Sequence, residues 1–351
     1  MEKIFNIHNL VKVKIDLKNP SLMKDVLCQL SEFEIFSCLT DEVFDVRIFD
    51  YQSRPKLPCP LVVSKYYYYQ SGVIDIPEEM FCANLVSRPI DVYCKHFALP
   101  VNFLIGLAFM RKNHALMHAA AVSFDDVNYL FPAFGGVGKT TAIAKIIDHG
   151  GKLFGDDLII VNSREMFAYP IDFSVYPYHL KVLPIKSSFV AGKLKMAKRL
   201  DSVAGFLAKF DFLPVQLAKK AIGYLSPPLV NVPPRDIFGA NCLARRGVPQ
   251  KILYLERKAL PGDEIIVGKI TASDLAIKAA NIMFHEWNQA MRIMYVYSAL
   301  SGFSMKKIFS DILSMYEEIF SRGDCYSLTI PDEITDQKYQ DELIDLMKKI
   351  K

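Results

Sequence analysis

A glycine-rich stretch in the middle of the chain has the residue types of a phosphate-binding loop. It follows a small-x-x-x-x-Gly-Lys-Thr pattern, with Ala133 in the position where a glycine is usual. Glycines can adopt positive φ and let consecutive backbone N–H groups turn toward one phosphate. In such a loop Lys139 reaches the β- and γ-phosphates of a nucleotide, and the Thr140 hydroxyl holds Mg²⁺. The residues expected to bind the nucleotide are Gly135, Gly136, Val137, Gly138, Lys139, Thr140 and Thr141.

The segments on either side of this loop support the interpretation. Residues 127–131 are a short run of strand-forming residues, and residues 141–147 carry apolar side chains at helical spacing. The predicted helix stops at Gly150, and its positive N-terminal end would point at a bound anion. Strand, glycine-rich loop and helix in this order are typical of a phosphate-binding loop. The alternative is a glycine-rich turn that happens to precede Lys139 and Thr140.

Two neighbouring aspartates and a histidine are further candidates for chemistry. Asp156 and Asp157 lie between two predicted strands, at 152–155 and 158–161. Near a nucleotide, one carboxylate can bind Mg²⁺ and a second can accept the proton of an attacking hydroxyl. The alternative for the pair is an Asp-Asp turn between strands, which is common. His118 stands at the entrance of the hairpin that leads into the loop, where a structural histidine is the more usual interpretation.

The order and spacing of these residues resemble the catalytic domain of the HPr serine kinase/phosphorylase family. The resemblance is carried by Met117–Val122, by the loop, and by Gly155–Asp157. His118 lies 21 residues before Lys139, and Asp156 and Asp157 lie 17 and 18 residues after it, separations similar to those of the family. A weaker likeness covers residues 225–257, which contain segments similar to the family's Asn-Val, Phe-Gly and Leu-Glu segments.

The resemblance implies an α/β fold, the phosphoenolpyruvate carboxykinase/HPr kinase-like variant of the P-loop fold, with ATP and Mg²⁺ as cofactors. By this likeness Asp157 would be the general base on a substrate hydroxyl, and Asp156 would bind Mg²⁺ together with Thr140. His118 would lie beside the transferred phosphoryl group. The implied activity is that of an ATP-dependent phosphotransferase, similar to a serine kinase, which transfers the γ-phosphoryl group to a serine-type hydroxyl of a peptide or protein.

The chain also departs from the family pattern. Residues 223–229 contain no counterpart of the family's glutamate, and residues 1–97 resemble no part of the family. These departures weigh against a phosphorylase back-reaction and against HPr as the substrate. Similar standalone kinases phosphorylate a serine of ribosomally made precursor peptides, such as lasso peptides, so a peptide acceptor is expected. A small-molecule hydroxyl kinase and a nucleotide-sensing binding module remain open alternatives.

Basic residues elsewhere are candidates for contacts with phosphate or with an acceptor. Residues 181–221 are predicted to be basic and helical, which suits an acceptor groove, a lid over the phosphates, or a solvated helix pair. Arg235, Arg245 and Arg246 are candidates for stabilising the transferred phosphoryl group. The sequence does not choose among these three arginines.

The pattern of apolar residues divides the chain into three parts. These are a small, β-rich α+β domain at 1–97, an α/β P-loop catalytic domain at 98–331, and a C-terminal helical tail at 332–351. Alternation of apolar and polar residues predicts strands at 11–17 and 43–49. Apolar residues at helical spacing predict helices at 22–33, 275–300 and 305–320.

Composition narrows the class of protein. The 351 residues are 51% hydrophobic and 23% charged, which fits a globular protein with a buried core, and the net charge of +4 is too small to indicate nucleic-acid binding. Seven cysteines include no Cys-x-x-Cys pair, so reduced thiols are expected rather than disulfides or a zinc site. The N-terminus lacks a signal-peptide region, and the longest apolar run is about thirteen residues, short of the roughly 20 that span a bilayer. We therefore predict a cytoplasmic protein without nucleic-acid or membrane partners, and the resemblance adds the expectation of a homo-oligomer.

Overall fold

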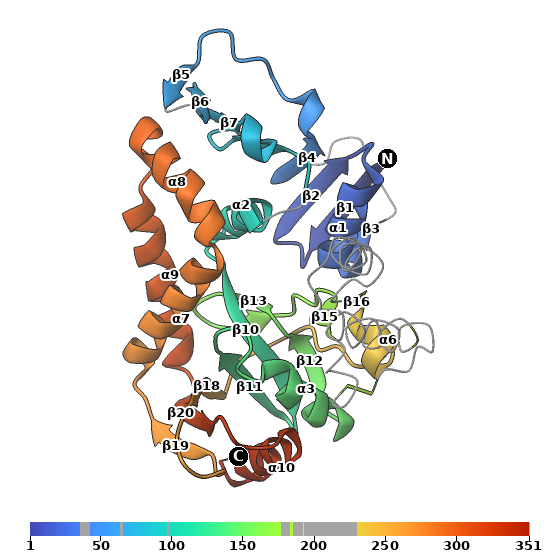
Figure 1. Cartoon of the computed structure of the whole chain (residues 1–351), viewed down its shortest axis with the longest axis vertical. Helices are drawn as coiled ribbons and strands as arrows, with labels where there is room; N and C mark the ends of the chain where they lie inside the picture. The colour runs from blue at the N-terminus through green and yellow to red at the C-terminus, as the bar shows by residue number, and fades with distance from the viewer. Residues whose placement is uncertain are drawn as a thin grey trace, which may run out of the picture.

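Two mixed β-sheets, with helices between and beside them, form the body of the protein (Figure 1). The structure, a computed structural model, describes residues 1–35, 43–63, 66–96, 99–176, 183–184, 192 and 230–350. Apart from three residues, the segment predicted to be basic and helical at 181–221 therefore lies outside the described part of the chain. The mixed α/β character expected from the sequence is confirmed.

The N-terminal part of the chain forms the first sheet. In spatial order its strands are β3 (Glu34–Ile35), β1 (Glu2–Ile7), β2 (Val11–Asp16), β4 (Val46–Asp50), β9 (Ile90–Cys94), β8 (Phe81–Asn84), β7 (Val73–Ile76), β6 (Tyr67–Gln70) and β5 (Leu61–Val63). Val11, Val13 and Ile15 are fully buried while the intervening lysines are not, as the alternation predicts. The strand predicted at 43–49 is β4, which starts at Val46.

Helix α1 (Pro20–Leu30) covers part of this sheet and begins at a polar cap. The Asn19 side chain accepts hydrogen bonds from the backbone N–H groups of Ser21 and Leu22, at 3.0 and 3.4 Å. Such a cap satisfies donors that the first turn of a helix leaves free. The helix predicted at 22–33 therefore begins earlier than expected, and its last turn is a 3₁₀ turn, η1 (Ser31–Phe33).

The second sheet carries the predicted chemistry. In spatial order its strands are β17 (Arg246–Gly247), β14 (Met166–Phe167), β13 (Leu158–Val161), β10 (Ala115–Phe124), β11 (Val127–Pro132), β18 (Lys251–Lys258), β20 (Asp324–Pro331) and β19 (Ile266–Lys269), and β12 (Lys152–Gly155) also pairs with β10. Strand β10 is buried on both faces. Ala119 and Ala121 belong to the core shared with the first sheet, and Ala120 and Val122 belong to a second core on the opposite face.

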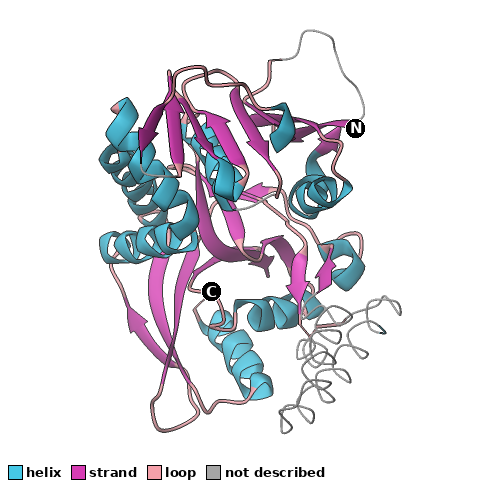
Figure 2. Ribbon diagram, turned by 45° about the horizontal axis from the view of Figure 1, so that its top comes forward, coloured by secondary structure: helices cyan, strands magenta, loops and turns pink. Residues whose placement is uncertain are grey.

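Helices α7 (Ala272–Glu286), α8 (Asn288–Ser301) and α9 (Met305–Phe320) lie along one side of the molecule in both views, and α2 (Leu99–Met110) lies on their inner side in Figure 1 (Figures 1 and 2). The helix predicted at 305–320 is confirmed as α9, but the one predicted at 275–300 is divided between α7 and α8. The break falls at Trp287, which is 2% exposed and packs edge-on against Phe103 at 5.1 Å. No described helix is long and apolar enough to cross a membrane.

Two helices pack on the other core of the second sheet. Helix α3 (Lys139–Asp148) follows the glycine-rich loop, and α10 (Asp336–Lys349) lies against it at the C-terminus (Figure 1). Gln340 donates a hydrogen bond to the Thr141 carbonyl at 3.0 Å, and Lys145 pairs with Asp341 at 3.2 Å. A short helix, α6 (Pro234–Phe238), and a strand pair, β15 (Phe173–Val175) with β16 (Val230–Val232), stand beside the sheet. The C-terminal helix thus holds the helix that starts at the loop.

Candidate functional site

The glycine-rich loop joins β11 to the first residue of α3, which is the arrangement predicted from the flanking residues. Gly136 and Gly138 have φ of +76° and +114°, values that residues with a side chain rarely adopt. A Cβ built on Gly135 or Gly136 would meet no atom within 4 Å, so this part of the loop faces open space. Val137, in contrast, packs against the second core, so only its backbone is left to face a ligand.

The two aspartates lie where β10 changes its pairing partner. β12 pairs with β10 through Ala121–Ser123, and β13 pairs with it through Ala115–His118. Asp156 and Asp157 fill the interval between the two strands, and the Asp157 carbonyl accepts a hydrogen bond from the Ala119 N–H at 3.2 Å. This irregular pairing brings the aspartates beside His118, although about 40 residues separate them in the chain.

Lys139 is buried and bonded to its own loop. Its side-chain ammonium donates to the carbonyls of Ala133 and Phe134 at 2.8 and 2.9 Å, and to His118 Nε2 at 3.0 Å. The residue is 5% exposed. Burial lowers the pKa of Lys139, while the nearby carboxylates, Asp157 first, oppose that change. The ammonium is thus held at the inner side of the loop by neutral acceptors.

His118 acts as an acceptor in this arrangement. Burial, followed by repulsion from Lys139, lowers the pKa of His118 to about 3, so the imidazole is neutral near pH 7. Because Lys139 donates to Nε2, the ring proton belongs on Nδ1. The Glu286 carboxylate lies 3.9 Å from the same Nε2, but a neutral ring that already accepts there has no proton to share with it. The histidine is therefore a partner of Lys139 rather than of Glu286.

Asp156 and Thr140 form the candidate metal site. The Thr140 hydroxyl donates to one carboxylate oxygen of Asp156 at 2.7 Å, while the other oxygen, Oδ1, is buried without a hydrogen-bond partner among the described residues. Burial, then repulsion from Asp157, raises the pKa of Asp156 to about 7. A buried oxygen without a donor beside a hydroxyl oxygen fits the ligand preference of Mg²⁺.

A metal ion at this position would need further ligands. The described residues contain no group of three or more His, Cys, Asp or Glu side chains that could hold a metal ion. Mg²⁺ in nucleotide sites keeps waters and phosphate oxygens and takes only one or two protein ligands. The two oxygens of Thr140 and Asp156 are consequently compatible with Mg²⁺ that arrives with a nucleotide.

Asp157 is half-buried and lies next to the cavity in front of the loop. Burial raises its pKa, and the positive charge of Lys139 lowers it. A carboxylate whose proton affinity is raised by burial is a better proton acceptor than one in water.

A cavity of about 510 Å³, here called the loop cavity, lies in front of these residues. It is lined by the loop glycines, Lys139, Thr140, Thr141, both aspartates, Ser174, Tyr176, Arg257 and Asp336. Apart from the three candidate arginines, the site residues predicted from the sequence all line this cavity except Val137 and His118, and His118 bonds to one that does. The structure therefore brings together residues from β10, the loop, α3 and the β12–β13 connection.

Arg257 is a residue of this cavity that the sequence analysis did not select. It lies near the end of β18, and its Nε is buried without a hydrogen-bond partner among the described residues. Strand β18 runs parallel to β11, whose end leads into the loop. Because the carboxyl ends of neighbouring parallel strands meet at one edge of a sheet, the position of Arg257 could have been expected once that pairing was known.

The three arginines that the sequence did suggest lie elsewhere. Arg235 forms a two-pronged ion pair with Glu32 at 2.8 Å, Arg246 is exposed on β17, and Arg245 lines a different cavity. None of them is among the residues that line the loop cavity. The prediction that one of these three contacts the transferred group gains no support from the fold.

Comparisons with known proteins add little to this geometry. No protein-family model and no curated protein matches the sequence. The structure aligns with that of the Hpr(Ser) kinase/phosphatase from Coxiella burnetii over 67% of this chain and 97% of that one, at 9% sequence identity and a TM-score of 0.27. A TM-score this low carries no argument about fold or function. Membership of the HPr kinase family stays a prediction, and the site has to support any proposed function.

Proposed function

We propose that the protein is an ATP- and Mg²⁺-dependent kinase that transfers the γ-phosphoryl group to a serine-type hydroxyl of a peptide or protein. The observation that supports this most is the convergence of Lys139, Asp156 and Asp157 on one cavity in front of a glycine-rich loop with open backbone. Phosphoryl transfer requires a group that binds the triphosphate, a ligand for the metal and an acceptor for the proton. Lys139, Asp156 and Asp157 would meet these three requirements in that order.

The residues divide the work as follows. The loop amides and the N-terminus of α3 would hold the phosphates, and Lys139 would exchange the carbonyls of Ala133 and Phe134 for phosphate oxygens. Mg²⁺, when bound, neutralises charge on the β- and γ-phosphates, and Thr140 and Asp156 are the residues that would hold it. His118 would keep Lys139 oriented through the bond to Nε2.

Asp157 is the proposed general base. The acceptor hydroxyl oxygen forms the new bond to the γ-phosphorus, the bond from that phosphorus to the β–γ bridging oxygen breaks, and ADP leaves. Asp157 takes the hydroxyl proton, for which its pKa, raised by burial, makes it suited. A serine of a ribosomally made precursor peptide is the acceptor we favour, and a small-molecule hydroxyl is the alternative.

One observation favours a second function, a nucleotide-sensing binding module. The bonds of Lys139 to its own loop carbonyls give the free protein an arrangement different from the one it needs around phosphates. A nucleotide would then act by moving Lys139, whether or not transfer follows.

The test is phosphoryl transfer from ATP labelled at the γ-position, with serine-containing peptide pools and metabolite pools as acceptors. Asp157→Asn is expected to lower transfer by at least about a hundredfold and to leave ATP binding nearly unchanged. Lys139→Ala is expected to lose both. Tight ATP binding by the unmodified protein without transfer to any acceptor would favour the sensing module, and full transfer by Asp157→Asn would remove Asp157 as the base.

A further inference from the structure

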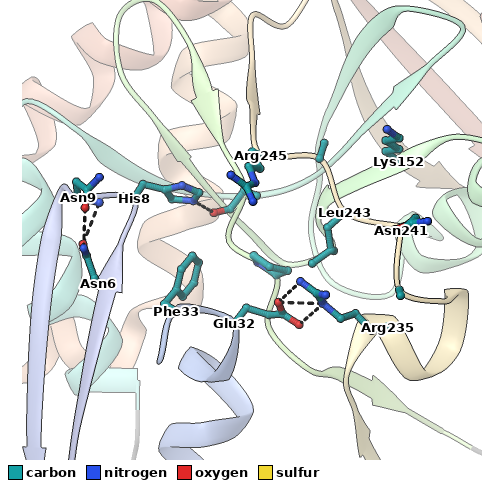
Figure 3. A pocket seen from close by; sticks show the side chains of 14 residues that line it. Asn6, His8, Asn9, Glu32, Phe33, Lys152, Arg235, Asn241, Leu243 and Arg245 are labelled. Carbon is teal, nitrogen blue, oxygen red and sulfur yellow. Dashed lines mark hydrogen bonds and ion pairs between the residues drawn. The ribbon is translucent and has the colours of Figure 1, made fainter. Parts of the chain in front are cut away.

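A second cavity lies outside the loop cavity, where the first sheet meets the second. It has a volume of about 670 Å³ and is called here the basic cavity. Its lining comes from the turn between β1 and β2, from η1, from the start of β12 and from the chain around residues 240–245 (Figure 3). The side chains that matter for its chemistry are His8, Glu32, Lys152, Arg235, Asn241 and Arg245.

The charges in this cavity are unbalanced. Its lining contains three cationic side chains, those of Lys152, Arg235 and Arg245, but only one carboxylate, that of Glu32. Arg235 already binds this carboxylate through contacts of 2.8 and 3.1 Å. Lys152 and Arg245 have exposed side chains, and neither forms a hydrogen bond or an ion pair through its side chain with any described residue. Two cations that have no partner among the described residues, in one concave surface, favour an anionic ligand.

The other polar groups are neutral. His8 approaches the Ala168 carbonyl with Nε2 at 2.7 Å, as the dashed line in Figure 3 marks, so this nitrogen carries the proton and donates. Burial lowers the pKa of His8, which keeps its ring uncharged near pH 7. The ring is fixed between Phe33 and Phe167, with centroids 5.4 and 5.6 Å away. His8 therefore adds no charge, and the positive charge of the cavity that is not paired with Glu32 resides on Lys152 and Arg245.

Two chain segments connect the basic cavity to the loop cavity. Lys152, at the start of β12, lines the first, and Asp156, just after the end of β12, lines the second. Likewise Ala168 and Pro170 line the basic cavity, and Ser174 and Tyr176 line the loop cavity. At about 3.3 Å per extended residue, each segment spans at most roughly 13 Å between the two cavities.

We propose that the basic cavity binds a carboxylate-bearing segment of the acceptor peptide, within about four residues along the extended peptide from the serine that reaches Asp157. This inference rests on the proposed function and names its substrate class, a peptide with Asp or Glu residues at that distance from serine. An extended peptide of about five residues is long enough to reach across a separation near that limit, whereas a free amino acid or a sugar is not. Lys152 and Arg245 supply the ion pairs, and Asn241 offers a neutral donor beside them.

The test measures peptide binding directly, so that it does not depend on catalysis. Fluorescein-labelled peptides with one serine and glutamates about four residues away on either side are titrated with the full-length protein, and anisotropy is followed. The same peptides with glutamine in place of glutamate serve as the matched probes. Glutamate peptides are expected to bind more tightly, by a ratio that falls as salt is added.

Variants locate the binding. Lys152→Ala and Arg245→Ala are each expected to weaken binding of the glutamate peptides by roughly threefold to fivefold, and glutamine peptides less. Arg246→Ala, which removes an exposed charge next in the chain but outside the cavity, is the matched control and should change nothing. Arg245→Glu should reverse the preference in favour of lysine-containing peptides.

Several results would overturn the proposal. Equal binding of glutamate and glutamine peptides, or an equal effect of Arg246→Ala, would show that the basic cavity is not the docking site. Competition by free glutamate as effective as that by the peptide would show a small-anion site instead. If the binding pattern holds but labelled ATP transfers no phosphate to these peptides, the docking inference stands and the proposed kinase function fails, so the two can be told apart.

Discussion

At the scale of single residues, the Lys139 ammonium is already held at the loop by acceptors of the protein itself. Two loop carbonyls and a neutral histidine accept from its ammonium. All three acceptors are uncharged, so they satisfy the ammonium without the strength of an ion pair, and phosphate oxygens would compete with them readily. The aspartates are close enough to favour the charged ammonium but are not bonded to it. Replacing the loop carbonyls by phosphate oxygens as partners of Lys139 should therefore require little free energy.

Arg257 is the residue-scale feature with the clearest consequence. Its Nε is buried at the loop cavity and has no hydrogen-bond partner in the described part of the chain, and an unsatisfied buried donor costs about 1–3 kcal/mol. A bound triphosphate would satisfy it, so Arg257→Gln is expected to weaken ATP binding about tenfold or more, and Arg257→Lys less. Isothermal titration calorimetry with ATP and Mg²⁺ measures this.

Arg246→Gln is the control for that experiment, because it removes the same charge from an exposed position on β17. Unchanged ATP affinity in Arg257→Gln, or an equal loss in Arg246→Gln, would mean that Arg257 does not contact the nucleotide.

At the scale of elements, the loop is fixed from behind by the C-terminal helix. Tyr339 of α10 is fully buried, and its ring lies 3.1 Å from where a Cβ on Gly138 would stand. The Thr335 side chain caps the start of α10, and Gln340 bonds back to α3. The C-terminal helix is consequently part of the support of the candidate site, although the sequence indicated only a helical tail at 332–351.

The loop glycines should differ sharply in what they tolerate. Gly138→Ala has to adopt φ of +114° and approach Tyr339, so a loss of about 1–3 kcal/mol in the free energy of unfolding is expected. Gly135→Ala has neither a positive φ nor a neighbour within 4 Å and should lose less than about 0.5 kcal/mol. Urea unfolding of both variants in the absence of nucleotide compares them, and equal losses would contradict the role given to Tyr339.

The elements near the loop could be read from the sequence because their signals are local. The run at 127–131, the glycines and the spacing after Thr140 predict β11, the loop and α3 at nearly the right bounds. The division of α7 from α8 could not be predicted in this way, because Trp287, where the helices divide, continues the apolar periodicity and packs on Phe103, far away in the chain. Arg257 was missed for the same reason, since its place depends on the pairing of β18 with β11.

At the scale of the whole molecule, contacts between distant parts of the chain join the first sheet to the second. His8 bonds to Ala168, 160 residues away, and Arg235 bonds to Glu32, 203 residues away. The Asp172 N–H also donates to the Cys28 carbonyl at 2.8 Å. No local pattern in the sequence signals such pairs, so neither this junction nor the basic cavity that it encloses could be predicted.

The junction carries a charge that the fold disfavours. Burial, with help from Asp236 and Glu32, raises the pKa of Asp172 to about 6, against about 3.9 in an unfolded chain. The folded protein therefore holds this proton more tightly, and stability declines as pH rises from about 4 to 6. Below that range Asp172 is neutral in both states and has no effect. Above that range the carboxylate is charged in the folded protein, and its destabilising effect on the fold has reached its maximum. This effect is smaller than for a fully buried carboxylate, because the side chain is partly exposed to solvent.

Asp172→Asn should therefore raise the Tm at pH 7.5 by roughly 2 °C, about 1 kcal/mol for a chain of this size, and leave it nearly unchanged at about pH 3, below both pKa values. Asp332→Asn, which removes a charge from an exposed residue, should have little effect at either pH. Thermal unfolding followed by circular dichroism at both pH values provides the comparison, and the difference between variant and parent cancels the titration of every other carboxylate. A gain of equal size at both pH values would mean that packing, not charge, sets the effect. In that case the junction would tolerate the carboxylate of Asp172 as well as water does.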